Sequence, residues 1–295
     1  FITFGFGFSM FLRKKITLRQ RGLLKESVNV VNTGGIVRLA RLILQGTLLF
    51  EGIGALILTL CFLRDMPFSQ ALYYGIFHSI SAFCNAGFDL MGAFGMSSFI
   101  GYNTNWIVCI TLMALIFIGG IGFFVWGDLK EHKLHIRKYA LHTKIVLITS
   151  LILIIGPSIL FLILERHALF ADMNTPQAIL NALFCAVTPR TAGFNTTDIA
   201  SLSQSSQLLT IILMFIGGCP GSTAGGAKVT TITVLILYLR SMLTRTDGVN
   251  IFKRRLEDEA VSKAAAVFTT HMLLAVAATF LISMQQDLDL TVIVF

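Results

Sequence analysis

Long apolar runs recur along the chain and are separated by short polar segments. They cover Leu39–Phe62, Trp106–Trp126, Ile145–Leu164 and Lys263–Ser283, and a fifth run, Leu208–Leu239, is interrupted. A helix needs about 20 apolar residues to cross roughly 30 Å of hydrocarbon. The pattern therefore predicts an all-α polytopic membrane protein.

Two shorter segments in the polar intervals resemble each other. Ser81–Asp89 and Val187–Asn195 each place Ala-Gly-Phe after a short apolar half-helix, and Gly87 aligns with Gly193 at an offset of 106 residues. Each segment lies between two membrane-length runs. A glycine loop repeated between hydrophobic helices is typical of a pore lined by backbone carbonyls.

A second pair of segments supports the repeat. Phe117–Phe123 (Phe-Ile-Gly-Gly-Ile-Gly-Phe) is echoed by Phe215–Gly221 (Phe-Ile-Gly-Gly-Cys-Pro-Gly) at an offset of 98 residues. The repeated unit is a membrane helix, a half-helix, a glycine loop and a second membrane helix. The half-helices are predicted over Ser69–Phe83 and Thr175–Thr188.

The repeat divides the chain into units and linkers. Two units are complete, and the chain opens and stops inside further units, so we expect a fragment of an array of four repeats that lacks the first and last parts. The predicted segments are the end of repeat 1 (1–12), a basic linker (13–38), repeat 2 (39–127, filter loop 84–89), a linker (128–144), repeat 3 (145–243, filter loop 189–195), a linker (244–262) and the start of repeat 4 (263–295).

Charge is scarce and clustered. Only 13% of residues are charged, and 19 of the 23 Lys and Arg fall within 13–41, 130–144 and 240–263. Basic residues favour the cytoplasmic ends of membrane helices, so these blocks are predicted to be cytoplasmic and the glycine loops to enter from outside. The net charge of +8 thus reflects topology, and nucleic-acid binding is not expected.

The two loops offer carbonyl groups to a cation. Gly87 and Gly193 admit backbone angles that let successive carbonyls point the same way, and half-helix C-termini carry partial negative charge. No acidic ring lies in either loop, which favours a monovalent ion. The candidate ion-binding residues are Asn85, Ala86, Gly87 and Phe88 in the first loop and Thr191, Ala192, Gly193 and Phe194 in the second.

Three acidic residues are each open to two interpretations. Asp89 and Asp198 follow the loops, where they either raise the local cation concentration or are ordinary solvated loop charges. Glu51 lies within a membrane-length run, where an acidic group is costly. It is either functional in itself or the partner of a basic group from another repeat.

A glycine-rich stretch interrupts the fifth apolar run. Its composition breaks a helix at membrane depth, and its place after a loop predicts a gate beneath the filter; a passive kink is the alternative. A phosphate-binding loop would need Gly-Lys-Ser/Thr, which is absent here. The candidate gating residues are Gly217, Gly218, Cys219, Pro220, Gly221, Ser222, Thr223, Ala224, Gly225, Gly226, Ala227 and Lys228.

These motifs together resemble the Trk/Ktr/HKT superfamily of potassium transporters, most closely the bacterial Ktr-type membrane pore subunit. The likeness rests on Phe77–Phe88, on Ala186–Asn195 with its Thr-Pro-Arg-Thr-Ala-Gly-Phe-Asn string, and on Met214–Gly218 with the stretch that follows. It implies four repeats around one pore, with Gly87 and Gly193 as filter glycines. It also implies that 217–228 is the gating loop of the third repeat.

The resemblance further implies potassium uptake through filter carbonyls in the cytoplasmic membrane of a bacterium. Its members act as homodimers on a cytosolic, nucleotide-binding regulatory ring of RCK type, so nucleotide is expected only on a partner. No covalent cofactor or enzymatic activity is expected, and sodium is a candidate activating ion. The alternatives are a sodium-conducting member of the same fold and a non-conducting membrane sensor or assembly subunit.

Overall fold

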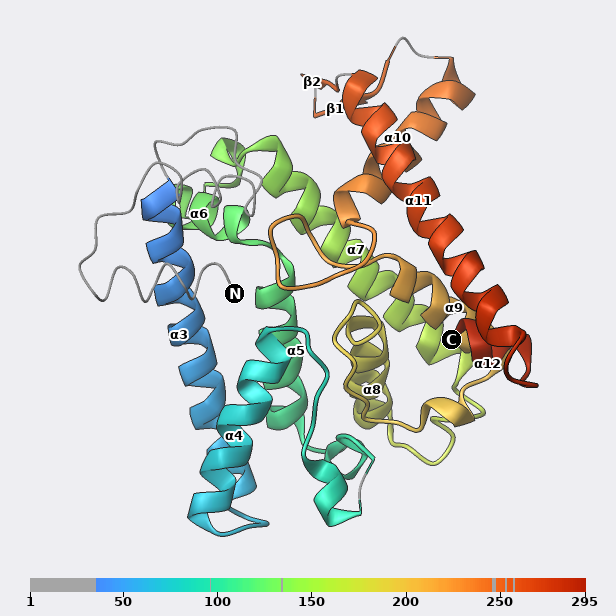
Figure 1. The fold of residues 1–295 in the computed structure, drawn as a ribbon. Helices are drawn as coiled ribbons and strands as arrows, with labels where there is room; N and C mark the ends of the chain where they lie inside the picture. The colour runs from blue at the N-terminus through green and yellow to red at the C-terminus, as the bar shows by residue number, and fades with distance from the viewer. Residues whose placement is uncertain (1–35, 96, 134, 246–247, 253, 257) are drawn as a thin grey trace.

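The computed structural model describes residues 36–295 except 96, 134, 246–247, 253 and 257, and it is predominantly helical (Figure 1). The predicted end of repeat 1 (1–12) and nearly all of the linker 13–38 lie outside the described residues. The remaining segments form two similar helical groups and a long C-terminal helix.

Repeat 2 begins with two antiparallel helices. Helix α3 (Ile36–Phe62) is followed after a short turn by the half-helix α4 (Phe68–Phe83). The two helices are close at Gly75, where a Cβ atom would lie 2.1 Å from the Thr59 Oγ1 atom. The absence of a side chain therefore lets α4 pack tightly along α3, and α5 (Trp106–Gly120) covers the pair.

Repeat 3 has the same order of elements. Helix α7 (Leu141–Leu164) precedes the half-helix α8 (Thr175–Val187), and α9 (Gln204–Phe215) and α10 (Val229–Thr244) follow. The Asn174 side chain accepts a hydrogen bond from the Gln177 backbone N–H at 2.9 Å, which caps the first turn of α8. The helix boundaries agree with the predicted ones to within a few residues.

The expectation of one continuous helix over Trp106–Trp126 was wrong. Helix α5 ends at Gly120, and the chain turns by 94° into α6 (Phe123–His132). The turn passes through Gly122 at φ +92°, where a Cβ atom would lie 2.6 Å from the Pro220 carbonyl oxygen. Glycine thus permits both the backbone angle and the close approach of another segment.

The C-terminal part contains α11 (Asp258–Ser283) and α12 (Leu290–Val294). A two-residue antiparallel pair, β1 (Asn250–Ile251) and β2 (Arg254–Arg255), precedes them. The predicted helical fold class is confirmed, and this pair is a minor addition to it. Short 3-10 turns complete the described elements: η2 (Met91–Phe94), η3 (Ile100–Tyr102), η4 (Ile136–Lys138) and η5 (Ile199–Ser201).

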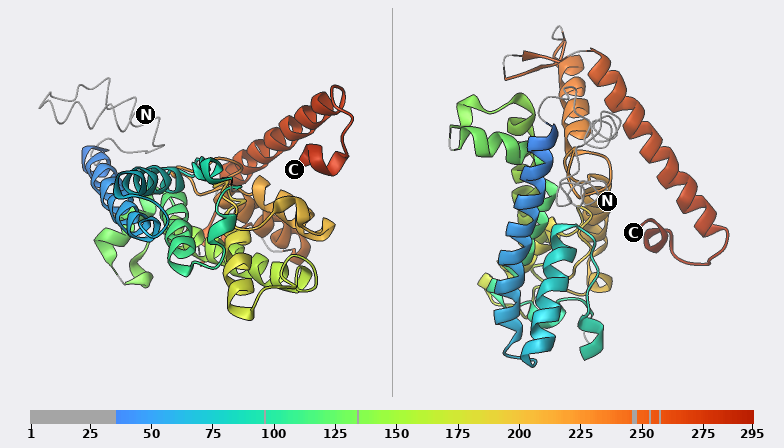
Figure 2. Two further views of the ribbon diagram at one scale, coloured as in Figure 1. Left: turned by 90° about the horizontal axis from the view of Figure 1, so that it is seen from below. Right: turned by 60° about the vertical axis from the view of Figure 1, so that its left-hand side comes forward.

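Three described helices, α3, α7 and α11, are long and apolar enough to cross a membrane, and the bent pair of α5 and α6 makes a fourth if it is counted as one span. No residue in the apolar window of α11 is buried, and Figure 2 shows most of this helix extending away from the other helices. Such large apolar surfaces fit a lipid environment or a partner element rather than water.

The described parts of the three basic blocks lie at one end of the molecule. These are the start of α3, the junction of α6 and α7, and the hairpin between α10 and α11 (Figure 1). The half-helix starts and the loops that precede them lie at the opposite end. This grouping at one end is what the charge pattern predicts if all three blocks face the cytoplasm. The cytoplasmic orientation itself stays a prediction.

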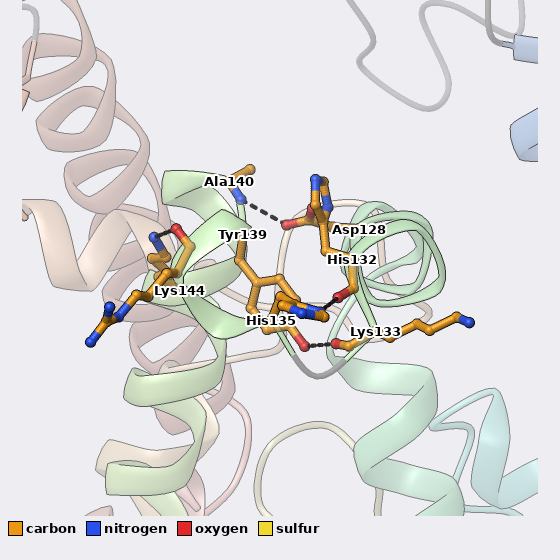
Figure 3. A network of polar contacts seen from close by, with 8 residues as sticks. Asp128, His132, Lys133, His135, Tyr139, Ala140 and Lys144 are labelled. Carbon is orange, nitrogen blue, oxygen red and sulfur yellow. Dashed lines mark hydrogen bonds and ion pairs between the residues drawn. The ribbon is translucent and has the colours of Figure 1, made fainter.

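Polar contacts order the linker between α6 and α7 (Figure 3). Asp128 Oδ1 lies 2.8 Å from His132 Nδ1, and Asp128 Oδ2 accepts the Ala140 backbone N–H at 2.8 Å. The Tyr139 hydroxyl donates to the Lys133 carbonyl. One carboxylate therefore joins the end of α6 to the start of α7.

Candidate functional site

The two filter loops, 84–89 and 189–195, share left-handed backbone angles at two aligned positions. Asn85 (φ 50°) and Gly87 (φ 72°) are left-handed in the first loop, and the aligned Thr191 (φ 66°) and Gly193 (φ 83°) are left-handed in the second. Left-handed angles are common for glycine but uncommon for asparagine and rare for threonine. The sequence repeat is therefore also a repeat of backbone geometry.

A hydroxyl group ties each loop back to its own half-helix. Ser81 Oγ donates to the Phe88 carbonyl at 2.7 Å, and Thr188 Oγ1 donates to the aligned Phe194 carbonyl. Sequence reasoning missed these two residues. The available signal was a hydroxyl residue near the end of each predicted half-helix.

The loops meet at their glycines. A Cβ atom on Gly87 would lie 2.6 Å from the Ala192 carbonyl oxygen and 2.9 Å from the Gly193 Cα atom. A Cβ atom on Gly193 would lie 3.0 Å from the Gly87 Cα atom. The predicted filter glycines are thus brought together backbone to backbone.

The phenylalanines at the outer ends of the two loops differ in solvent exposure. The Phe194 side chain is fully buried, whereas the aligned Phe88 side chain is 71% exposed. The rings of Phe99 and Phe194 pack at a centroid distance of 5.5 Å, and the Phe99 backbone N–H donates to the Asn195 carbonyl at 2.8 Å. The segment after the first loop therefore covers the second loop.

The glycine-rich loop, 217–228, folds back on itself between α9 and α10. The Gly217 backbone N–H donates to the Ala227 carbonyl at 2.9 Å, and Gly218 donates to the Gly225 carbonyl at 3.2 Å. A Cβ atom on Gly217 would lie 1.9 Å from the Gly225 carbonyl oxygen. A side chain at Gly217 is incompatible with this fold of the loop.

The glycine-rich loop docks on the bend between α5 and α6. The Cys219 backbone N–H donates to the Gly120 carbonyl at 3.0 Å, and the Thr223 N–H donates to the Gly119 carbonyl at 3.2 Å. In return the Phe123 N–H donates to the Gly221 carbonyl at 2.8 Å. The carbonyls left free at the end of α5 thus find partners on the loop.

The same loop contacts both filter loops. Thr223 Oγ1 donates to the Phe83 carbonyl at 2.9 Å and accepts from Asn85 Nδ2 at 3.1 Å. The Gly225 backbone N–H donates to Thr191 Oγ1 at 3.2 Å. The structure therefore brings all three predicted site segments into one hydrogen-bonded cluster.

Two basic side chains lie in this cluster. Lys228 Nζ donates to the Ala224 carbonyl at 2.7 Å, within the glycine-rich loop. Arg190 is 8% exposed and lines a small cavity with Ser150 and Gly218, and its Nε atom has no hydrogen-bond partner among the described residues. The buried Arg190 was not among the residues that sequence reasoning selected.

The acidic candidates make mostly local contacts. Asp89 Oδ1 accepts the Met91 backbone N–H at 2.9 Å. Asp198 Oδ2 accepts from Ser201 Oγ at 2.6 Å, and hydrogen bonds from Ser201 and the Ala200 N–H lower the pKa of the exposed Asp198. The structure thus places both carboxylates in loop turns and leaves both interpretations of their charge open.

Glu165 is a buried acid that sequence reasoning missed. It follows α7, and its side chain is fully buried. Glu165 Oε1 accepts from the Ser203 backbone N–H at 3.0 Å and from Ser203 Oγ at 2.6 Å, and Oε2 accepts from the Leu169 N–H at 3.3 Å. The carboxylate fixes the start of α9 against the end of α7.

The chain is similar to known uptake proteins. The potassium/sodium uptake protein NtpJ of Enterococcus hirae is 36% identical over 280 residues, which cover 95% of this chain and 61% of that protein. The Ktr system potassium uptake protein B of Bacillus subtilis is 33% identical over 297 residues, which cover 100% of this chain and 66% of that protein. The chain thus spans less than two thirds of the length of these relatives.

A solved structure shares the fold. The crystal structure of the potassium transporter TrkH from Vibrio parahaemolyticus superposes with a TM-score of 0.70 over 88% of this chain and 54% of that chain, at 20% identity. A family model described as TrkH, a cation transport protein, matches residues 2–295. The resemblance drawn from the Thr-Pro-Arg-Thr-Ala-Gly-Phe-Asn string is confirmed: the chain belongs to the TrkH family of cation transport proteins.

Proposed function

We propose that the full-length protein takes up potassium across the cytoplasmic membrane of a bacterium. Carbonyls of the two filter loops would replace part of the hydration shell of the ion, and loops of further repeats would complete the ring. The observation that carries the proposal is the shared left-handed backbone at Asn85, Gly87, Thr191 and Gly193, in two loops that meet at their glycines.

Further repeats are needed because two loops alone do not enclose an ion. The exposed Phe88 supports this need, since the aligned Phe194 is covered by Phe99 of the preceding unit. An equivalent aromatic residue of repeat 1 would cover Phe88 in the same way. Helices α4 and α8 end at the loops, so their partial negative charges would favour a cation there.

The glycine-rich loop 217–228 is proposed as the gate. It breaks the helix of repeat 3 and is hydrogen-bonded to both filter loops, a position from which it would obstruct the path beneath them. Glycines at 217, 218, 221, 225 and 226 leave the segment free to rearrange once its contacts are released.

The proposal includes the orientation of the pore in the membrane and its assembly with other subunits. The basic end of the molecule would be cytoplasmic, and the filter loops would open to the outside. A homodimer on a cytosolic, nucleotide-binding ring would use that basic end as its docking surface. The Ktr system proteins among the relatives are named as parts of a system, which supports a partner subunit.

The test is uptake of rubidium and sodium by the full-length protein in a strain without its own potassium uptake systems. Rubidium uptake that potassium suppresses and sodium does not would support the proposal. Gly193→Asp should abolish uptake while the protein still inserts into the membrane, because a side chain there strains the loop and meets Gly87. Gly52→Ala, at an open position of α3, is the matched control and should behave as wild type.

Sodium is the second candidate ion, because the relative from Enterococcus hirae is named a potassium/sodium uptake protein. Sodium uptake that potassium does not suppress would show that the same pore conducts sodium instead of potassium. Absence of both fluxes from inserted protein supplied with its partner subunit would contradict transport and favour a sensor or assembly role.

A further inference from the structure

We propose that Asn85 and Thr191 act as two latches that hold the glycine-rich loop closed against the filter. The inference rests on the proposed function of the filter and of the gate, and it names the side chains that join them. The two residues occupy the same position of the two filter loops. Each uses its side chain to contact the glycine-rich loop.

The first latch joins Asn85 to Thr223. Asn85 Nδ2 donates to Thr223 Oγ1 at 3.1 Å, and the same hydroxyl donates to the Phe83 carbonyl at 2.9 Å. The hydroxyl of Thr223 thus acts as donor and acceptor at once, with one partner in the first filter loop and the other at the end of α4. These residues are 138 and 140 positions apart in sequence, so the contact exists only in the folded loop.

The second latch joins Thr191 to Gly225. The Gly225 backbone N–H donates to Thr191 Oγ1 at 3.2 Å. Because Gly225 donates with its main chain, only the residue at 191 supplies a side chain to this contact. The glycine-rich loop is therefore held at two points, one for each filter loop.

Backbone angles support a role for these two side chains. Both residues are left-handed, at φ 50° for Asn85 and φ 66° for Thr191, although glycine would adopt these angles without strain. A β-branched residue in this region is strained and persists where its surroundings hold it. The hydroxyl of Thr191 explains why a strained residue occupies this position.

The arrangement couples the filter to the gate. The carbonyls of Asn85 and Thr191 are filter candidates, and their side chains are the latches, so release of the loop frees the same residues that would bind the ion. Coupling between two sites is reciprocal. Ion occupancy and the position of the glycine-rich loop should therefore influence each other.

Thr223→Val tests the first latch in the full-length protein, because valine keeps the shape of threonine and removes the hydroxyl. Cys219 serves as a native reporter, since its side chain is 1% exposed in the docked loop. A neutral hydrogen bond is worth about 0.5–1.5 kcal/mol, and Thr223→Val removes two, so the rate of Cys219 alkylation should rise roughly 5- to 160-fold. Peptide-resolved mass spectrometry separates Cys219 from the other cysteines.

Two controls accompany this variant. Thr223→Ser keeps the hydroxyl and should label at the wild-type rate. Ser222→Ala removes a neighbouring hydroxyl that accepts a hydrogen bond from the Ala224 N–H at 3.3 Å, within the glycine-rich loop. This variant should also leave labelling unchanged. A rise in all three variants would show general loosening and would overturn the latch.

Asn85→Gly and Thr191→Gly keep the left-handed backbone and remove the latch side chains. Asn85→Gly combined with Thr223→Val should label no faster than Thr223→Val alone, because Thr223→Val already removes the hydroxyl that Asn85 contacts. Thr191→Gly combined with Thr223→Val should be additive. Additivity in the first pair would overturn the assignment of Asn85.

Rubidium uptake distinguishes the latch from the proposed function. If wild-type protein takes up no rubidium, the proposed function fails, and Cys219 labelling still decides the latch. If shortening 217–228 raises uptake while Thr223→Val changes neither uptake nor labelling, the gate stands and the latch is overturned. The latch predicts faster uptake by Thr223→Val with an unchanged preference for rubidium over sodium.

Discussion

Replacing Gly87 by alanine tests the filter assignment most directly. The substitution adds one methyl group at φ 72°, where an alanine residue costs about 1–2 kcal/mol. The new Cβ atom would lie 2.6 Å from the Ala192 carbonyl oxygen, against 3.4 Å for an ordinary contact, so one of the loops must move by 0.8 Å. That shift exceeds the tolerance of about 0.5 Å for a binding site.

The aligned substitution provides an internal scale. Gly193→Ala is strained by a similar backbone angle, φ 83°, but its Cβ atom would lie 3.0 Å from Gly87 Cα, which requires a movement of only 0.4 Å. We expect Gly87→Ala to lose rubidium uptake more than 10-fold, since about 1.4 kcal/mol already changes an equilibrium tenfold. Gly193→Ala should retain more uptake, and Gly52→Ala should match wild type.

The assay is initial-rate rubidium uptake, normalised to the amount of full-length protein in the membrane. Thermal unfolding of the detergent-solubilised variants separates loss of uptake from loss of fold. Equal uptake in Gly87→Ala and Gly52→Ala would refute the reasoning, because the geometry assigns a collision to one residue and open space to the other. Greater loss in Gly193→Ala than in Gly87→Ala would refute the contact distances.

Three further predictions concern stability, two measured by thermal unfolding and one by amide exchange. Burial raises the pKa of Glu165, but hydrogen bonds from Ser203, Ser206 and backbone N–H groups outweigh it, and the pKa falls below its ordinary 4.5. The ionised Glu165 carboxylate should therefore stabilise the fold above pH 4.5, and this stabilisation should be lost as pH falls through the lower folded pKa. Glu165→Gln should lower the free energy of unfolding by about 1–3 kcal/mol. The variant should not show the pH-dependent loss of stability that wild type shows. Asn174→Ala removes the cap of α8 and should cost about 1 kcal/mol, and an unchanged melting temperature would contradict the cap. Asp128→Asn should loosen the linker between α6 and α7, measured as faster amide exchange at Ala140, and unaltered exchange would contradict the bridge.

The helix limits were largely predictable from the sequence. Apolar length located α3, α7 and α11, because hydrocarbon thickness sets the number of residues in a span. Glycine and proline located the break after α9, where no regular helix continues through 217–228. The half-helix α8 was recognisable from its apolar run between polar turns.

The bend after α5 was not predictable in this way. Glycine in a helix costs only about 1 kcal/mol relative to alanine, so Phe117–Phe123 is compatible with a continuous helix. The bend exists because N–H groups of Cys219 and Thr223 occupy the Gly120 and Gly119 carbonyls. Those donors come from a segment about a hundred residues away, and local periodicity carries no information about them.

The sequence by itself determined the membrane class, the repeated unit and the positions of Gly87 and Gly193, since each depends on local composition or on spacing along the chain. Only the tertiary structure decided which polar groups pair. It brought Asn85 to Thr223 and Thr191 to Gly225, and it buried Arg190 and Glu165. The physical reason is that a hydrogen bond needs two groups within about 3 Å, and partners far apart in sequence meet only when the helices have packed.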